Sequence, residues 1–265
     1  MNKNLFYPVE KVLASDIAPG LGFNSNITHA VVVNTPNGKQ VVNFCSEDYR
    51  LVPNAEILPP LIGELGDSWK IEVLSRTFAE SMFYIDVIFK NKKFKISGKD
   101  DIFPKLTIYN SYNGKMRYQF IMGFYRLICS NGLTIPIVDS LTKIKAMHTP
   151  KIEKLVDPDT IKIMVNEFNQ NAIELMEPYL ILQDQKVGNM PLRIESVIDD
   201  TAFPGRQLEN VIDRATEEIQ SGLAPTDWVT YNAFNYQLNH NEEIGMPEHK
   251  KNKLDQEVLD YLLRY

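Results

Sequence analysis

The spacing of apolar residues changes near residue 150, and this change constrains the fold of the 265-residue chain more than any other feature. Before it, short β-branched and aromatic runs are separated by turn residues, a pattern typical of strands. After it, apolar residues recur every three or four positions, a pattern typical of helices. We therefore predict an α+β fold in which a β-rich part, residues 1–150, forms a largely antiparallel sheet that the helical part, residues 151–265, packs against. A sheet with one apolar face must be covered by a second layer, so we expect one integrated domain.

The strand-like runs begin with a hairpin, in which residues 28–34 and 39–44 flank a Pro-Asn-Gly turn. Residues 54–65 predict helical turns interrupted by Pro59 and Pro60. Further strand-like runs follow at residues 69–79, 82–90, 92–96, 106–112 and 116–125. Asn113-Gly114 separates the last two runs and predicts a tight turn with Gly114 in a left-handed conformation.

Helices are expected in the last third of the chain. The first spans residues 158–179, with Asp157 or Asp159 available as its N-terminal cap. Residues 182–206 look like a loop because they contain Gly188, Pro191, Pro204 and Gly205. Three further helices are predicted at residues 207–222, 226–240 and 254–265.

Charge is distributed unevenly along the chain. The net charge is −3 over residues 1–83, +8 over residues 84–154 and −11 over residues 155–265. A basic block rich in Tyr and Phe is the composition expected of a surface that follows a phosphate backbone and stacks bases. The simpler alternative is that the basic and acidic blocks are solvated faces that attract one another.

The sequence offers little for catalysis or for cofactors. Nucleotide-binding, hydrolase and zinc motifs are absent, so we expect neither a cofactor nor a metal. Cys129 follows Arg126 by three residues, which leaves a thiol enzyme as an alternative, but a small buried cysteine is the simpler interpretation. Clustered carboxylates such as 100–101, 199–200 and 217–218 leave a metal-dependent nuclease as another alternative.

Composition also bears on localisation. Hydrophobic residues make up 44% and charged residues 23% of the chain, which is typical of globular proteins rather than disordered ones. The longest apolar run has only about four or five residues, far short of the ~20 that a membrane span needs. The N-terminal residues lack the apolar segment of a signal peptide. We therefore expect a cytoplasmic protein with no membrane partner.

Several short motifs in order resemble a known family. The first three are residues 49–54 (YRLVPN), 108–114 (IYNSYNG) and 126–133 (RLICSNGL). The fourth is residues 228–234 (WVTYNAF), which is followed by His240. Together they resemble the domain-of-unknown-function family 932, whose members occur on phages and plasmids. Tyr112 and Asn113 stand where this family usually has His and Asp, which puts in doubt any role that needs the imidazole.

The resemblance implies a mobile-element protein, because members of the family lie beside DNA-processing genes. Combined with the basic block, it leads us to expect a protein that binds single-stranded DNA in replication or recombination. Strand annealing and a homo-oligomer, as in the annealing proteins of phages, are extensions of this expectation. The alternatives are a protein-interaction or anti-defence module, in which the acidic part mimics phosphate, and the enzymes already mentioned. Under the nucleic-acid hypothesis the cations and stacking rings are Lys90, Lys92, Lys93, Lys95, Tyr109, Tyr112, Lys115, Arg117, Tyr118 and Arg126.

The same motifs have a structural interpretation that must be weighed against the functional one. Asn110–Gly114 can form a turn stabilised by Asn and Ser side chains. Trp228, Tyr231 and Phe234 are spaced to pack from one face of a helix. These structural roles need no ligand.

Overall fold

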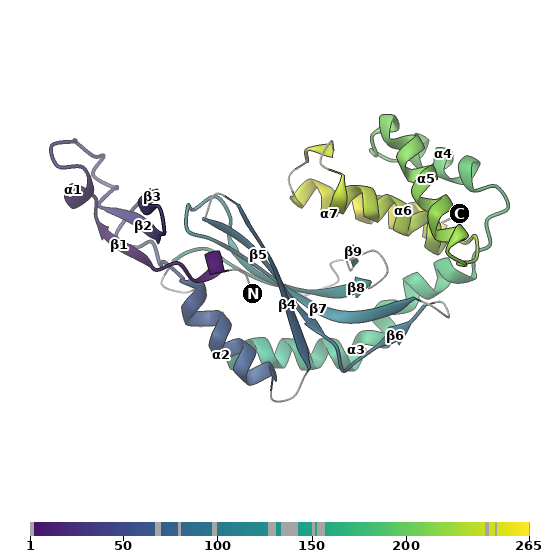
Figure 1. The fold of residues 1–265 in the computed structure, drawn as a ribbon, viewed down its shortest axis with the longest axis horizontal. Coiled ribbons are helices and arrows are strands. Elements are labelled where there is room, and N and C mark those ends of the chain that lie inside the picture. The colour runs from purple at the N-terminus through teal and green to yellow at the C-terminus, as the bar shows by residue number, and fades with distance from the viewer. Residues whose placement is uncertain are drawn as a thin grey trace. The chain divides into compact units, whose positions relative to one another are not determined.

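The computed structural model of the chain describes residues 3–66, 70–78, 81–96, 100–126, 131–133, 143–149, 152, 157–241, 244–246 and 248–264. Its elements (Figure 1) confirm the α+β class. The strands are β1 (Val9–Leu13), β2 (His29–Thr35), β3 (Gly38–Cys45), β4 (Ile71–Phe78), β5 (Met82–Phe89), β6 (Phe94–Lys95), β7 (Asp101–Ser111), β8 (Tyr118–Arg126), β9 (Asn131–Leu133) and β10 (Lys143–Ala146). The helices are α1 (Ala14–Ile17), α2 (Asn54–Gly66), α3 (Pro158–Asp184), α4 (Met190–Asp200), α5 (Leu208–Gln220), α6 (Asp227–His240) and α7 (Glu248–Arg264), with 3-10 turns η1 (Lys3–Phe6) and η3 (Gly205–Gln207).

The strands form two sheets. The small sheet has the order β1-β2-β3, and its neighbouring strands are antiparallel. The large sheet has the order β10-β8-β7-β5-β4, with β6 paired to β7 and β9 paired to β8. The pairs for which the register is defined are antiparallel, for example Tyr84 opposite Tyr109 and Ile144 opposite Phe120. The predicted hairpin and the predicted largely antiparallel sheet are therefore confirmed.

The chain divides into two compact units, and their boundary does not fall at residue 150. Unit 1 comprises residues 1–91, 105–122 and 137–169, and unit 2 comprises residues 92–104, 123–136 and 170–265. Each unit therefore combines strands and helices, because β7, β8 and α3 contribute residues to both. That residues 1–150 and 151–265 form one integrated domain stays a prediction.

In unit 1, β5 shows why the large sheet has two different faces. Phe83, Ile85 and Val87 are at most 1% exposed, whereas Tyr84 and Asp86 between them are partly exposed. Side chains alternate between the faces of a strand, so one face belongs to the core and the other reaches solvent. The partly exposed face is the one available to a ligand.

Helix α2 is continuous, whereas the sequence pattern predicts helical turns interrupted by prolines. Pro59 and Pro60 lie inside it rather than interrupting it, and both are exposed. The buried side chains of α2 are apolar apart from that of Asn54, and they lie on the side of the helix facing the core. Burial of these side chains outweighs the loss of backbone hydrogen bonds at the prolines. An ion pair between Lys162 and Glu64 links α3 to α2.

Unit 2 is built around α6, where eleven of the fourteen residues are buried. Helices α5 and α7 and strand β9 contact it. The predicted helices at 207–222 and 226–240 correspond to α5 and α6, and Gly222 follows α5 with φ +98°. No helix among the described residues is long and apolar enough to cross a membrane.

The loop predicted at residues 182–206 is wrong in its centre, where α4 forms. The side chain of Asn189 accepts a hydrogen bond from the backbone N–H of Leu192, and Pro191 stands in the first turn. Proline is compatible with the first turn of a helix, because the N–H that it lacks has no partner there. Pro191 therefore marks the start of a helix rather than a break.

Candidate functional site

The family motifs of unit 1 meet in a buried polar cluster. The side-chain amide of Asn110 donates to the carbonyl oxygen of Val52 and to Oδ1 of Asn54, both at 2.8 Å. The backbone N–H of Asn54 donates to the hydroxyl of Tyr112 at 2.9 Å, and Asn54 Nδ2 donates to the carbonyl of Leu5. Asn54, Asn110 and Tyr112 are each at most 2% exposed. These hydrogen bonds join the end of β7 to the start of α2.

Tyr49 and His148 lie beside this cluster and stack on one another, with ring centroids 5.1 Å apart. The hydroxyl of Tyr49 donates to the carbonyl of Ser111, and Nδ1 of His148 lies 3.1 Å from the carbonyl of Arg50. Burial lowers the pKa of His148, although backbone carbonyls partly oppose this. His148 therefore acts as a neutral, packed ring at neutral pH.

The predicted turn between β7 and β8 is confirmed, with φ +69° at Gly114. Both polar atoms of the Asn113 side-chain amide stabilise the turn. Nδ2 donates a hydrogen bond to Ser81 Oγ, and Oδ1 accepts one from the backbone N–H of Lys115. The hydroxyl of Ser111 closes the turn by exchanging hydrogen bonds with the backbone of Met116. The structural interpretation of this motif is thus supported by its contacts.

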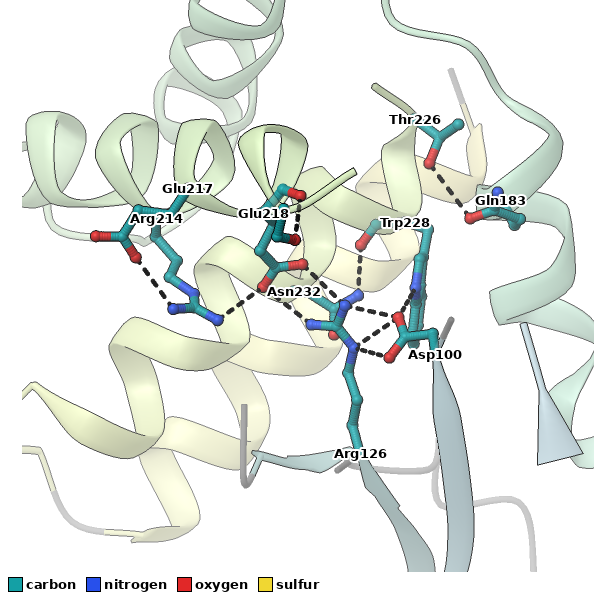
Figure 2. A network of polar contacts seen from close by, with 10 residues as sticks. Asp100, Arg126, Gln183, Arg214, Glu217, Glu218, Thr226, Trp228 and Asn232 are labelled. Atoms are coloured by element: carbon teal, nitrogen blue, oxygen red, sulfur yellow. Dashed lines mark hydrogen bonds and ion pairs between the residues drawn. The ribbon is translucent and has the colours of Figure 1, made fainter. Parts of the chain in front are cut away.

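The motifs of unit 2 meet in a second buried network, shown in Figure 2, centred on Arg126. Arg126 Nε donates to both oxygens of Asp100 at 2.7 and 2.8 Å, and Nη1 and Nη2 donate to Glu218 at 2.9 Å. Arg126 and Asp100 are fully buried, and Glu218 is 2% exposed. Burial by itself would lower the pKa of Arg126, but the hydrogen bonds and charges of Glu218 and Asp100 together raise it above its usual value. Arg126 is therefore a permanent buried cation.

Trp228, Arg214 and Asn232 complete this network. The indole N–H of Trp228 donates to Asp100 Oδ2 at 2.7 Å, and Arg214 Nη2 donates to Glu218 Oε1 at 3.2 Å. The amide of Asn232 donates to the carbonyl of Trp228. Two buried carboxylates are thus balanced by two guanidinium groups, and the motif residues tie β8 to α5 and α6.

The network accounts for two of the three carboxylate clusters, at residues 100–101 and 217–218. Asp100 and Glu218 are the buried partners of Arg126, whereas their neighbours Asp101 and Glu217 form ion pairs with Lys93 and Arg214. In the described part of the chain, no group of three or more His, Cys, Asp or Glu side chains could hold a metal ion. Nothing in the sequence identified Asp100 and Glu218 as partners of Arg126, which lies 26 and 92 residues away from them.

Three of the predicted nucleic-acid contacts lie in the interior. Tyr112, Tyr118 and Arg126 are 1%, 2% and 0% exposed. Burial raises the pKa of Tyr112 to about 12 and raises that of Tyr118 further. A ring or guanidinium group at these positions is not available to a base or a phosphate in this structure.

Tyr109 lies on the partly exposed face of the large sheet. Its ring meets that of Tyr84 edge to face across the β5–β7 pair, with centroids 5.2 Å apart. Both residues are partly exposed. Tyr84 was not among the residues predicted from the sequence, although alternation along β5 places it on the same face as Asp86 and so predicts its exposure.

The predicted lysines of unit 1 differ in their surroundings. Lys90 is paired with Glu72 at 2.8 Å, so its charge is largely compensated. Lys115 and Arg117 are exposed in the turn between β7 and β8. Neither cation has an ion-pair partner among the residues that the structure describes. They are the two predicted cations of unit 1 that remain open to a phosphate.

In unit 2, Lys92, Lys93 and Lys95 cluster around β6. Lys92 lies over the ring of Phe94 at 5.8 Å, and Lys93 pairs with Asp101 at 3.1 Å. Lys95 is exposed. The positive charge of this group is therefore partly compensated.

The cysteines and a pocket are the remaining candidates. Cys129 lies outside the described residues, and the other cysteine, Cys45, is a buried thiol whose pKa is raised by burial. A pocket of about 260 Å³ in unit 1 lies between the first residues of α2 and α3. Its lining residues are Arg50, Leu51, Val52, Glu56, Ile57, Ile152, Asp157 and Pro158.

Comparison with known proteins gives one match. A family model described as Domain of unknown function (DUF932) matches residues 41–260. No curated protein and no solved structure matches the chain.

Proposed function

The chain belongs to the DUF932 family, as the order of its motifs indicated, and within this family we propose that it binds single-stranded nucleic acid. Among the described motif residues, those buried in the two polar clusters are Asn54, Asn110, Tyr112, Arg126, Trp228 and Asn232. A ligand must therefore be met by side chains outside these two clusters.

The observation that carries the proposal is the edge-to-face pair of the partly exposed rings of Tyr84 and Tyr109 in unit 1, which the exposed cations Lys115 and Arg117 follow in the chain. Tyr109 precedes the end of β7 by two residues, which is about 7 Å of strand, and the turn with both cations follows directly. Partly exposed aromatic rings can stack on bases, and cations next to them can neutralise phosphates. This combination fits an unpaired strand, because the bases of a duplex are stacked on one another and not free to meet a ring.

Charge compensation supports this choice of surface over the rest of the basic block. Lys90 and Lys93 are paired with Glu72 and Asp101, so a phosphate would have to displace a carboxylate from each of them. Lys115 and Arg117 have no carboxylate partner among the described residues. They are expected to contribute most of the salt-dependent affinity of unit 1.

The binding test uses a fluorescently labelled single-stranded oligonucleotide, and anisotropy is measured over a series of salt concentrations. Reversing both charges in Lys115→Glu/Arg117→Glu should weaken binding strongly and reduce the slope of log K against log salt by about 1–2, one for each phosphate that is no longer neutralised. Tyr84→Ala/Tyr109→Ala should weaken binding by about 1–3 kcal/mol for each base that is no longer stacked.

A matched control is Lys186→Glu/Lys250→Glu, which makes the same change in net charge at two exposed lysines of unit 2. It should bind nearly as well as wild type. Equal losses in the control and in Lys115→Glu/Arg117→Glu would show that only overall charge matters. The proposal fails if the wild-type protein binds no oligonucleotide at low salt, and a protein-interaction role would then be favoured.

The wider role that we propose is replication or recombination of a mobile element in the cytoplasm of its bacterial host, with strand annealing as the activity. Annealing can be followed from the quenching of two complementary labelled oligonucleotides. If the protein binds single strands but does not accelerate their pairing, the binding proposal stands and the annealing activity is refuted.

A further inference from the structure

The two edges of the small sheet in unit 1 differ in how well they are protected from pairing with another strand. β1 follows Pro8 and carries Glu10 and Lys11 in its middle, and both proline and charge discourage pairing at an edge. β3 is longer, contains no proline and carries a single charge, on Lys39 near its start, so that a bulge is its one protecting feature among those that discourage edge pairing. Among the described strands, β2 alone pairs with β3, so the outer edge of β3 is open.

A bulge in β3 gathers apolar side chains on one face of this sheet. Val32 is opposite Val41 and Val31 is opposite Asn43, so Val42 is the extra residue. An extra residue shifts the alternation by one position, and Val41 and Phe44 therefore share a face. Both are 42% exposed, and the ring of Phe44 lies against that of Phe23 at 5.3 Å.

Exposed apolar residues are concentrated around this sheet. Among the described residues, five of the twelve large hydrophobic side chains with high exposure lie between residues 13 and 44, and Leu21 is exposed to 66%. The five are Leu13, Ile17, Leu21, Val41 and Phe44. Such a concentration in one small region is typical of an interaction surface, whereas single exposed residues are not.

We propose that β3 pairs in antiparallel fashion with β3 of a second copy of this chain, so that two small sheets join into one. The unpaired N–H and C=O groups of an open edge are a template for pairing with another strand, and a second copy necessarily presents the same open edge. Pairing about a two-fold axis also brings the exposed apolar face of one copy next to that of the other. Both the backbone groups and the apolar side chains are then removed from water by the same partner.

The charges on β1 and β3 themselves do not oppose pairing with a second copy. Glu10 and Lys39 form an ion pair at 3.0 Å on this sheet, so their two charges compensate each other. With the two-fold axis near Val42, Lys39 of one copy lies opposite the far end of β3 in the other. The two Lys39 side chains therefore do not face each other across the new pair.

The test measures the mass of the full chain by sedimentation equilibrium over a range of concentrations. Wild type should rise from a monomer of 30.4 kDa to twice that mass. Val41→Asp/Phe44→Asp places like charges on both copies and removes the apolar contact, so it should remain a monomer at concentrations where wild type is mostly dimer. The matched control Ile173→Asp/Leu192→Asp changes two exposed apolar residues of unit 2 in the same way and should dimerise as wild type does.

A second measurement uses only the wild-type protein, so its result does not depend on whether a variant folds. Amide hydrogen exchange of wild type should slow in β3 as concentration rises, with little change in β1. The proposal is overturned if wild type stays monomeric up to its solubility limit. It is also overturned if a dimer forms without added protection in β3, or if the control pair disrupts the dimer as much as Val41→Asp/Phe44→Asp does.

Discussion

Removing the guanidinium group of Arg126 should cost unit 2 a large part of its stability. Arg126→Met keeps most of the side-chain volume but leaves Asp100 and Glu218 buried without their main cation. Breaking a buried ion pair from one side typically costs about 3–5 kcal/mol, because the remaining charge stays desolvated and uncompensated. Here one side chain serves two carboxylates, with Nε and both Nη atoms engaged.

Although two carboxylates lose their cation, the loss in the free energy of unfolding should not be twice that of a single ion pair. Trp228 continues to donate to Asp100 at 2.7 Å, and Arg214 continues to donate to Glu218 at 3.2 Å. We therefore expect a total of about 3–5 kcal/mol, against a typical total stability of about 5–15 kcal/mol. At about 2–4 °C per kcal/mol for a chain of this size, the melting temperature should fall by about 10 °C.

The assay is urea denaturation followed by circular dichroism, with Arg126→Lys and Arg117→Met as comparisons. Lysine keeps the charge but lacks the planar group of three nitrogen donors that binds both carboxylates. The loss of stability in Arg126→Lys should therefore be smaller than that in Arg126→Met. Arg117 is exposed and has no ion-pair partner in the described part of the chain, so Arg117→Met should change stability by less than about 0.5 kcal/mol. An Arg126→Met variant as stable as wild type would refute the assignment of this network as a buried structural element.

Three further predictions concern the stability of unit 1. Asn110→Asp replaces the amide donor by a carboxylate oxygen that faces the oxygens of Val52 and Asn54. The free energy of unfolding, measured by urea denaturation, should therefore fall by about 2–3 kcal/mol. Unchanged stability would contradict the hydrogen bonds assigned to Asn110. Gly114→Ala should cost about 1–2 kcal/mol, because φ is +69° and the added Cβ would lie 3.2 Å from Asn43 Nδ2; a wild-type melting temperature would disprove the left-handed turn. Burial raises the pKa of Tyr112 to about 12, so the folded state keeps a proton that the unfolded state loses above about pH 10, and stability should fall as pH rises from 10 to 12. The phenolate absorbance that is missing in Tyr112→Phe is the share due to Tyr112 and should appear in wild type together with loss of ellipticity; its appearance in the folded protein at pH 10 would argue against burial of Tyr112.

Local sequence patterns were sufficient for the order and type of most elements. The spacing of apolar residues predicted the hairpin of β2 and β3 and the helices α3, α5 and α6, because periodicity depends on neighbouring residues alone. Asn113-Gly114 predicted the turn between β7 and β8 for the same reason. α4 was missed because proline was taken as a break, although the Asn-x-Pro start was visible in the sequence. The family, too, was recognisable from short motifs in order.

Only the tertiary structure shows which side chains are exposed and which ion-pair partners they have. The charge of residues 84–154 suggested one basic surface, yet Arg126 is buried between two carboxylates and Lys90 and Lys93 are compensated by Glu72 and Asp101. Tyr109 and Tyr112 are three residues apart in sequence, but one ring reaches the open face of the sheet and the other is 1% exposed. Local patterns cannot predict such differences, because burial depends on which distant segments pack against a side chain. Arg126 meets Glu218 across 92 residues, and that meeting exists only once the chain has folded.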